Sequence, residues 1–268
     1  MIRNSGADRS LKKREKREAL AGMRILDLHA HLGRTSSGEA NSASLLVDEL
    51  RAFGIERTGI SSLSGTVTRD QNDLVHSAVQ QFPDFVVGYA FINPKAPDAF
   101  DEVDRTLGDM GLSGVKFHPW KHGYYADNCP EIDGVLSRIK AYGVHVQVHV
   151  GTSPLCTPFP WIDYAKAHPD LRFVFTHMGC REFGFSTIDA IRDIENIWVE
   201  TSCQMEVENL EKAVRELGSK RIAFGSDWPY KPRTSKSIRC CTSGYRMTSW
   251  KTFSGATRST FGRRKDRK

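Results

Sequence analysis

The sequence predicts an α/β fold of the (β/α)8 TIM-barrel type, on three observations. From Met23 onward, short runs rich in β-branched and aromatic residues alternate with amphipathic helical segments, which is the pattern of a parallel sheet built from βα units. The runs number eight and the helical segments between them seven, whereas an open doubly wound sheet usually has fewer strands and a glycine-rich first turn. The length of 268 residues is close to the roughly 250 that such a barrel needs.

The expected strands and helices alternate along the chain. We expect strands over Arg24–His29, Ile55–Leu63, Phe85–Ile92, Ser113–His118, Val144–Val150, Arg172–His177, Ile197–Ser202 and Arg221–Ser226. We expect helices over Ser44–Phe53, Asp73–Gln81, Pro97–Met110, Ile132–Tyr142, Trp161–His168, Thr187–Ile194 and Glu206–Leu217. Glycine follows several of these helices, and its tolerance of a left-handed backbone is typical of the residue that ends a helix.

The two ends of the chain do not fit the barrel pattern. Residues 1–22 form a basic leader that we expect to lie outside the fold, with Met23 favoured as the biological start. The barrel is assigned to residues 23–232. Residues 233–268 are basic, rich in Ser and Thr and without hydrophobic periodicity, so we expect the eighth helix to be missing or disrupted. This tail is either disordered or the product of a shifted reading frame; we favour the second, which the nucleotide sequence would decide.

The net charge of +6 arises at the two ends. Residues 1–22 contribute +4 and residues 231–268 contribute +11, so residues 23–230 carry a net charge of −9. An acidic body argues against a nucleic-acid partner, because phosphate binding needs a basic face on the folded domain.

The remaining composition narrows the class of protein further. No apolar run approaches the roughly 18 residues of a membrane span, so we expect no membrane partner. The basic first residues are not followed by an apolar stretch, which argues against a secretory signal, and a cytoplasmic location is expected. The six cysteines form no C-x-x-C pair, so we expect reduced thiols rather than a zinc ribbon or a disulfide framework.

Histidines end the first predicted strand. Side chains alternate across a strand, so Asp27, His29 and His31 are expected to share one face. A pair of histidines two residues apart is a weak signal alone. It gains weight here because the carboxyl ends of barrel strands are where catalytic and ligand-binding residues stand.

Polar residues end most of the other predicted strands as well. Burying such residues at the ends of apolar strands costs desolvation free energy unless a cation or substrate interacts with them. The residues are Lys116, His118, His149, His177, Glu200, Ser202 and Asp227. Separate structural roles explain one or two of these positions more easily than all of them, so the sequence predicts a metal or substrate site at the barrel mouth.

These motifs together resemble the amidohydrolase superfamily, specifically its amidohydrolase-related branch, which also contains decarboxylases. The resemblance runs from about Met23 to Pro232 and is carried by the first-strand H-x-H, then HVG, HMG and GSDWP in that order. It implies one divalent metal, with Zn²⁺ the expected ion, bound by His29, His31, His149 and Asp227. His177 would be a second ligand or, more often in this branch, the residue that activates water together with Asp227.

Lys116 lies near the strand-four lysine that is carbamylated in binuclear members of the superfamily. A single metal is commoner in this branch, so we expect Lys116 to orient an anionic substrate. His118, Trp120 and Glu200 are further candidates for substrate binding. Aromatic residues on the loop after His118 serve packing as often as recognition, and both roles stay open for them.

The resulting prediction is a metal-dependent hydrolase that acts on a C–N or C–O bond of a small, anionic substrate. The alternative is a non-oxidative decarboxylase on the same metal site, which the ligands alone do not separate. A metal-dependent deoxyribonuclease is disfavoured by the acidic body, and an inactive product of a disrupted gene is a further alternative. The expected partner is a small molecule; assembly into a homo-oligomer is left open.

Overall fold

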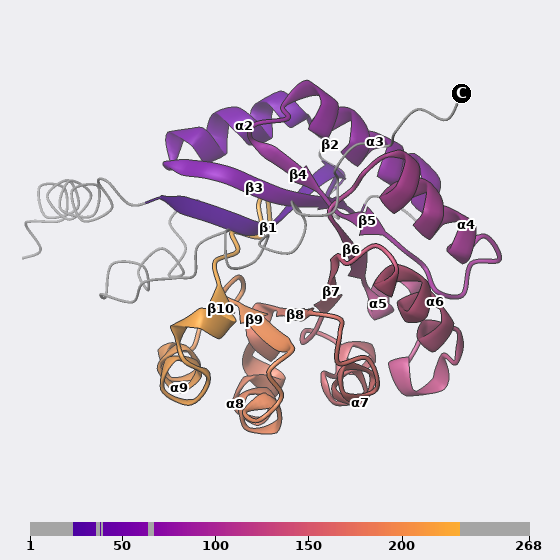
Figure 1. Ribbon diagram of the computed structural model, residues 1–268. Coiled ribbons are helices and arrows are strands. Elements are labelled where there is room, and N and C mark those ends of the chain that lie inside the picture. Colours follow the sequence, from indigo (N-terminus) through magenta and orange to yellow (C-terminus); the bar gives the residue numbers. More distant parts are fainter. Residues whose placement is uncertain (1–23, 36–37, 39, 64–66, 231–268) are drawn as a thin grey trace, which may run out of the picture.

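The computed structural model describes residues 24–35, 38, 40–63 and 67–230 (Figure 1). The predicted leader over residues 1–22, the predicted tail over residues 233–268 and the missing eighth helix lie outside the described residues.

Parallel strands form the centre of the molecule (Figure 1). The strands are β1 (Ile25–Arg34), β2 (Ala40–Asn41), β3 (Ile55–Ser62), β4 (Val86–Gly88), β5 (Ala90–Phe91), β6 (Gly114–Phe117), β7 (His145–His149), β8 (Phe173–Thr176), β9 (Ile197–Glu200) and β10 (Ile222–Ala223). Their order is β2-β1-β3-β4 in one sheet and β5-β6-β7-β8-β9-β10 in the other. Only β2 runs antiparallel to its neighbour among these described strands, as a short addition to the end of β1.

Two seams join the sheets into a barrel. At the first, the strand predicted over Phe85–Ile92 is divided into β4 and β5, and Tyr89 between them donates its backbone N–H to Ile60 O at 2.8 Å. At the second, the segment after β10 pairs with β1: Leu28 N donates to Phe224 O at 2.8 Å and His31 N to Trp228 O at 2.7 Å. The predicted barrel is therefore confirmed.

Helices lie around the outside of the strands (Figure 1). They are α2 (Ala43–Ala52), α3 (Thr68–Gln81), α4 (Ala99–Val103), α5 (Pro119–His122), α6 (Glu131–Lys140), α7 (Phe159–Ala167), α8 (Cys180–Ile191) and α9 (Val207–Leu217). The π-helix η1 (Asp104–Asp109) continues α4, and four described 3-10 turns are η2 (Ala126–Asn128), η3 (Pro154–Cys156), η4 (His177–Gly179) and η5 (Ser219–Arg221). The helix predicted from Thr187 begins earlier, at Cys180, where it follows the η4 turn at the end of β8.

Local sequence explains where these helices begin and end. In α9 the buried Leu210, Ala213 and Leu217 recur at spacings of three and four residues, which places them on the face that meets the sheet. Gly218 ends α9 with a φ of +72°, a conformation that glycine adopts without strain. At the start of α2, the side chain of Ser42 accepts a hydrogen bond from Leu45 N at 3.1 Å.

Apolar side chains pack on both sides of the strands. The larger core lies between the sheets and the helices, and includes the fully buried Trp161 and Phe175. A smaller cluster fills the barrel interior with side chains from strands of both sheets: Leu28, Val87, Tyr89, Val174, Trp198 and Ala223. The polar residues at the strand ends lie beyond this interior cluster, toward the mouth of the barrel.

The strand on which Asp27 was expected to share a face with His29 and His31 contains an irregularity. The register of β1 against β3 shifts between Asp27 and Ala30, so strict alternation is lost there. The Asp27 carboxylate instead accepts hydrogen bonds from Thr58 Oγ1 at 3.2 Å and Ser226 Oγ at 2.6 Å. Burial raises the pKa of Asp27 to about 7. Its hydrogen bonds link β1 to β3 on one side and to the segment after β10 on the other.

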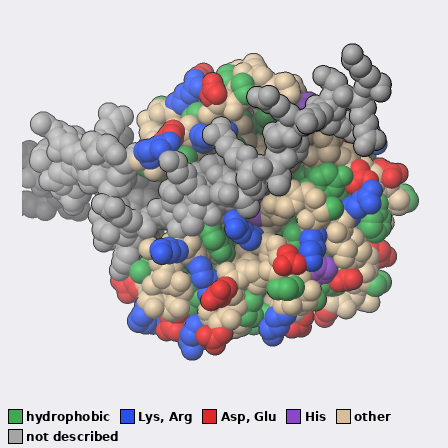
Figure 2. Space-filling model, in the orientation of Figure 1, with side chains coloured by type: hydrophobic (Ala, Val, Ile, Leu, Met, Phe, Trp, Pro, Cys, Tyr) green, Lys and Arg blue, Asp and Glu red, His purple; other side chains and the backbone are tan. Residues whose placement is uncertain are grey.

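The surface of the described residues mixes charges of both signs. On the face shown in Figure 2, Lys and Arg alternate with Asp and Glu rather than gathering into a broad basic area. Among the described helices, none is long and apolar enough to cross a membrane.

Candidate metal centre

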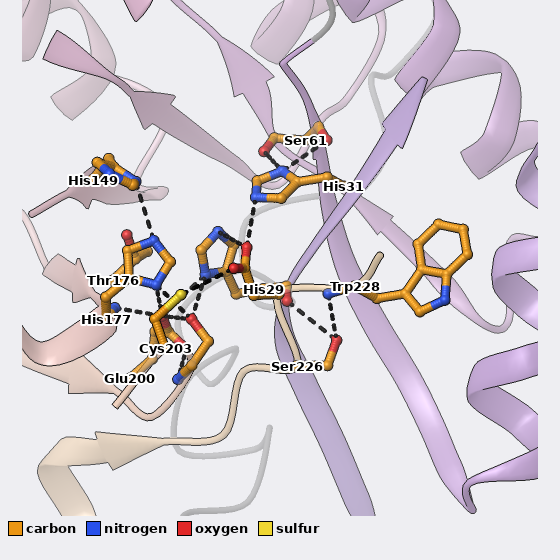
Figure 3. Close-up of polar contacts among 12 residues, drawn as sticks. His29, His31, Ser61, His149, Thr176, His177, Glu200, Cys203, Ser226 and Trp228 are labelled. Carbon is orange, nitrogen blue, oxygen red and sulfur yellow. Dashed lines mark hydrogen bonds and ion pairs between the residues drawn. The ribbon is translucent and has the colours of Figure 1, made fainter. Parts of the chain in front are cut away.

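The predicted site residues gather at the carboxyl ends of the strands (Figure 3). His29 and His31 belong to β1, Lys116 to β6, His149 to β7 and Glu200 to β9, while Asp227 follows β10. Every one of these side chains is buried. The mouth therefore holds several titratable groups in a space shielded from water, where their mutual contacts determine their protonation.

The contact between His31 and Asp227 is the first indication of a cation site. His31 Nδ1 lies 3.2 Å from Ser61 Oγ, which can accept or donate, and 3.3 Å from the backbone carbonyl of Ser61, which can only accept, so a proton on Nδ1 satisfies both contacts in the neutral ring. The lone pair of His31 Nε2 then faces Asp227 Oδ1 at 3.2 Å. Two acceptors at this distance need a positive charge between them, either a proton or a metal ion.

His29 is oriented in the same way. Its Nδ1 lies 3.0 Å from Glu200 Oε1, and its Nε2 lies 3.9 Å from Asp227 Oδ1. Burial, helped by the positive charge of Lys116, holds the pKa of His29 well below its usual value, so the ring is neutral. With the Nδ1 proton directed at Glu200, the Nε2 lone pair is available to a cation.

Asp227 supplies the negative charge of this group. Burial alone would raise the pKa of Asp227, but its contact with His31 and the nearby imidazoles hold that pKa well below its usual value. His29, His31 and Asp227 each offer a ligand atom, and these atoms lie within 4.8 Å of one another. Two imidazole nitrogens and one carboxylate fit a divalent cation of the zinc type and leave a coordination position open.

His149, also expected to bind the metal, lies on the far side of His177. His149 Nδ1 is 3.1 Å from His177 Nε2, and its Nε2 is 3.0 Å from Thr152 Oγ1. Its ring also stacks on His118 with a centroid distance of 3.9 Å. The structure thus groups His149 with His118 and Cys156 as possible ligands, and not with His29, His31 and Asp227.

His177 lies between these two groups. Its ring centroid is 4.9 Å from that of His29 and 4.7 Å from that of His149. Burial lowers the pKa of His177 to about 3, so the ring is neutral near pH 7. Its Nδ1 lies 2.8 Å from Ser202 Oγ, which fixes the plane of the ring.

Glu200 was expected to bind substrate, and the structure places its carboxylate wholly among protein groups. Glu200 Oε1 accepts from His177 N at 2.6 Å, Oε2 accepts from Ser202 N at 2.8 Å, and the hydroxyl of Ser202 also donates to Oε1. The sequence placed Ser202 among the polar residues at the strand ends but gave it no role of its own. Together Glu200 and Ser202 orient His29 and His177.

Lys116 is fully buried beside the cation group. Its Nζ lies 3.4 Å from His29 Nε2 and donates to Thr176 Oγ1 at 3.1 Å. Burial lowers the pKa of Lys116 to about 8, while Glu200 and Asp227 act in the opposite direction. The amine is therefore mostly protonated at pH 7 and brings a positive charge to the mouth.

The loop after β6 divides into packing and exposed residues. Tyr124 is buried, and His122 stacks on Phe91 with a centroid distance of 4.3 Å, so both pack against the barrel. His118 is buried at the start of α5, whereas the ring of Trp120, 5.9 Å from that of His118, is 53% exposed. Trp120 is thus available to a molecule that enters the mouth.

Three cysteines near the mouth were not predicted as site residues. Cys156 lies with His118 and His149, while the Cys203 thiol donates to Asp227 Oδ2 at 3.1 Å and is hydrogen-bonded to that of Cys180. The cysteines of the described part of the chain are free thiols, as expected. The irregular spacing of these cysteines forms no sequence motif, so their positions near the site are apparent only from the fold.

Comparison with known proteins identifies a family for the chain. A family model described as amidohydrolase matches residues 39–237, a region that starts after His29 and His31. No curated protein sequence matches the chain.

Solved structures share the fold at low identity. One is 5-carboxyvanillate decarboxylase from Novosphingobium aromaticivorans with bound manganese, with a TM-score of 0.68 and 13% identity over 87% of this chain and 97% of that one. Another is 2,6-dihydroxybenzoate decarboxylase from Rhizobium, with a TM-score of 0.63 and 16% identity over 86% of this chain and 95% of that one. A third is a probable 2-pyrone-4,6-dicarboxylic acid hydrolase from Acinetobacter baumannii, with a TM-score of 0.57 and 18% identity over 87% of this chain and 92% of that one. Since the family model covers most of the barrel, the chain belongs to the amidohydrolase family of enzymes.

Proposed function

We propose that this enzyme is a metal-dependent hydrolase that cleaves a C–N or C–O bond of a small, anionic substrate. The observation that carries the proposal is the contact of His31 Nε2 with Asp227 Oδ1 at 3.2 Å, two acceptor atoms held together in a buried site. Beside them lies a neutral imidazole, His177, within reach of the same space. A cation site with an adjacent base is the arrangement that hydrolysis by activated water requires.

His29, His31 and Asp227 are the proposed ligands, with Zn²⁺ the proposed ion because imidazole nitrogen suits it well. His149, the fourth ligand proposed from the sequence, reaches this ion only if its ring leaves His177. A bound divalent cation would supply Lewis-acid charge that acidifies water and polarises a substrate oxygen.

His177 is the proposed general base. The Ser202 hydroxyl donates to Glu200, so it accepts from His177 Nδ1–H, and the lone pair of His177 is left on Nε2. In this structure Nε2 accepts from His149 Nδ1. His177 can therefore take a proton at Nε2 while Ser202 and Glu200 hold the ring and stabilise the positive charge. Asp227, the other proposed catalytic residue, lies close enough to favour the imidazolium by its charge.

Lys116 supports an anionic substrate. Its ammonium and a divalent cation together exceed the two negative charges of Asp227 and Glu200, so the occupied mouth has a net positive charge. A substrate carboxylate or phosphate placed there gains a charge-assisted hydrogen bond from Nζ. We propose His118 and Trp120 as further substrate contacts, and Glu200 as a residue that acts through His29 and His177.

Decarboxylation is the second candidate, favoured by one observation. Two of the solved structures with this fold are decarboxylases of aromatic acids, and one of them holds manganese. On the same residues, Lys116 and the cation would hold the substrate carboxylate, and a protonated group would deliver a proton to carbon.

Isotopes separate the two functions. The zinc-loaded enzyme is incubated with a panel of small lactones, amides and aromatic carboxylates in ¹⁸O-labelled water, and in parallel in deuterium oxide. A hydrolase leaves one ¹⁸O in the acid product and releases no carbon dioxide. A decarboxylase releases carbon dioxide and leaves deuterium on carbon. Turnover that persists after complete chelation of metal would contradict both. The predictions of a cytoplasmic location, of no nucleic-acid partner and of a possible homo-oligomer stand as further proposals beside this one.

A further inference from the structure

A second set of ligand atoms lies on the other side of Asp227. It consists of His177, Cys203 and Asp227, whose ligand atoms lie within 4.8 Å of one another. His177 and Asp227 are buried and Cys203 is half-buried. In Figure 3 the sulfur of Cys203 lies beside the ring of His177.

The two oxygens of Asp227 face different ligand sets. Oδ1 lies 3.2 Å from His31 Nε2 and 3.9 Å from His29 Nε2. Oδ2 lies 3.1 Å from Cys203 Sγ. A carboxylate with one oxygen toward each set is placed to bridge two cations, one bound by the histidines of β1 and one bound by Cys203 and His177.

The backbone holds all three residues of the second set in an unusual conformation. The φ angles of His177, Cys203 and Asp227 are +65°, +55° and +55°, a region that residues other than glycine rarely adopt. Such positions persist only where the surrounding structure requires them, and they concentrate at functional sites. A second thiol, that of Cys180, is hydrogen-bonded to Cys203 and stands at a φ of +51°.

We propose that Cys203, His177 and Asp227 form a second cation position that shares Asp227 with the first. The inference rests on the proposed function only for the first ion. On binding, the S–H bond of Cys203 breaks, its proton passes to solvent, and the sulfur lone pair binds the ion with no change of oxidation state. A thiolate with an imidazole selects borderline or soft ions such as Zn²⁺, Co²⁺ and Cd²⁺ over Mg²⁺ or Mn²⁺.

The second position has a consequence for the proposed reaction. An ion there holds His177 by a ring nitrogen, so His177 no longer accepts a proton. An excess of a soft cation therefore inhibits the enzyme, while Mg²⁺ or Mn²⁺ in the same excess does not.

Cobalt titration tests the proposal because thiolate ligands give Co²⁺ an intense near-ultraviolet charge-transfer band. The apo protein is titrated with Co²⁺, and bound metal is counted by mass spectrometry. We expect two equivalents in the unchanged chain, with the band growing only with the second. Cys203→Ser is expected to bind one equivalent without the band. The matched control is Cys129→Ser, which alters a buried thiol that is hydrogen-bonded to Glu131. It is expected to keep both equivalents and the band.

Each other result has a defined meaning. One equivalent without the band in the unchanged chain overturns the second position and leaves the proposed function intact. One equivalent with the band overturns the bridging arrangement. No bound metal overturns the proposed function and the inference with it. Loss of the band in Cys156→Ser but not in Cys203→Ser assigns the thiolate to the His118 and His149 group and overturns the proposal.

A second measurement needs no variant. Iodoacetamide is applied to the unchanged chain, first without metal and then with two equivalents of Cd²⁺, and alkylation is mapped by mass spectrometry. We expect Cys203 to be alkylated without metal and at least tenfold less with Cd²⁺. Equal alkylation in both conditions overturns the proposal even where Cys203→Ser fails to fold.

Discussion

Asp227 Oδ1 and His31 Nε2 lie 3.2 Å apart, although Asp227 follows the last strand of the barrel and His31 belongs to the first. The carbonyl of Ser61 keeps the proton of His31 on Nδ1, so the facing atoms are both acceptors. The strand seam determines this distance, because Asp227 N donates to His29 O at 2.7 Å. Barrel closure and the cation site therefore depend on the same hydrogen bonds.

Glu200→Gln is expected to weaken metal binding. Glu200 holds His29 by Nδ1 and positions Ser202, and loss of such a partner lowers metal affinity by roughly 10- to 100-fold. Competition with a chromogenic zinc chelator measures the change. The exposed Glu208→Gln on α9 serves as control and keeps the affinity of the unchanged chain. Equal zinc affinity in both variants would show that Glu200 does not orient a ligand.

Gly225→Ala is expected to destabilise the fold and displace Glu200. A Cβ at Gly225 would lie 1.8 Å from Glu200 Oε2, so either the backbone or the carboxylate must move. Overpacking of this kind costs about 1–3 kcal/mol, measurable by urea unfolding. At Gly108, in η1, a Cβ meets nothing closer than 3.4 Å, so Gly108→Ala is the matched control and should not lower stability. A Gly225→Ala protein as stable as Gly108→Ala would contradict the packing argument.

His145 is expected to make the fold sensitive to acid. Burial lowers its pKa to about 3, so the folded chain keeps it neutral while the unfolded chain protonates it below about 6.5. Its contribution to stability is full above pH 6.5 and is lost as the pH falls toward 3. Between pH 7.5 and pH 5 the unchanged chain should lose about 2 kcal/mol more than His145→Gln. Urea unfolding at both pH values checks this; a constant difference between the two proteins would refute it.

His177→Ala is expected to lower kcat by about 10²- to 10⁴-fold, since a positioned general base contributes that much. The ion of the first position should be retained, because His29, His31 and Asp227 are intact. His168, which contacts Asp133 at 2.8 Å near the end of α7, is the control, and His168→Gln should retain full activity. Intact turnover in His177→Ala would exclude His177 as the base.

Lys116→Gln is expected to reduce kcat/KM for an anionic substrate by about 10- to 100-fold, in line with about 1.5–3 kcal/mol for a hydrogen bond to a charged group. A neutral ester of the same substrate should lose far less, and this difference is the readout that a merely structural change would not produce. Lys121→Gln, on the adjacent α5, is the control. An equal loss for both substrates would show that Lys116 does not recognise charge.

The barrel could be predicted because its signals are periodic and local. The apolar spacing of α9 and the β-branched runs of β7 and β8 reflect burial that every barrel requires. The division of one predicted strand at Tyr89 and the register shift after Asp27 could not be predicted. Both depend on the neighbouring strand, which no local pattern describes.

The site was predictable in its residues and not in its pairings. His29, His31 and Asp227 meet as their strand ends suggested. The pairing of His149 with His177, and its stacking on His118, depend on ring orientations that a sequence does not encode. Cys203 could not be foreseen, because a left-handed residue after β9 is what turns its thiol toward Asp227.

The seam between β10 and β1 also sets the order in which this site can come into being. A ribosome makes His29 and His31 early and Asp227 near the end of the described chain, so the nascent protein holds two histidines without their carboxylate for most of its synthesis. Ion capture at the proposed site becomes possible only when the final strand has docked. A cation bound at the proposed site would therefore indicate that translation has passed Asp227 and that the barrel has closed.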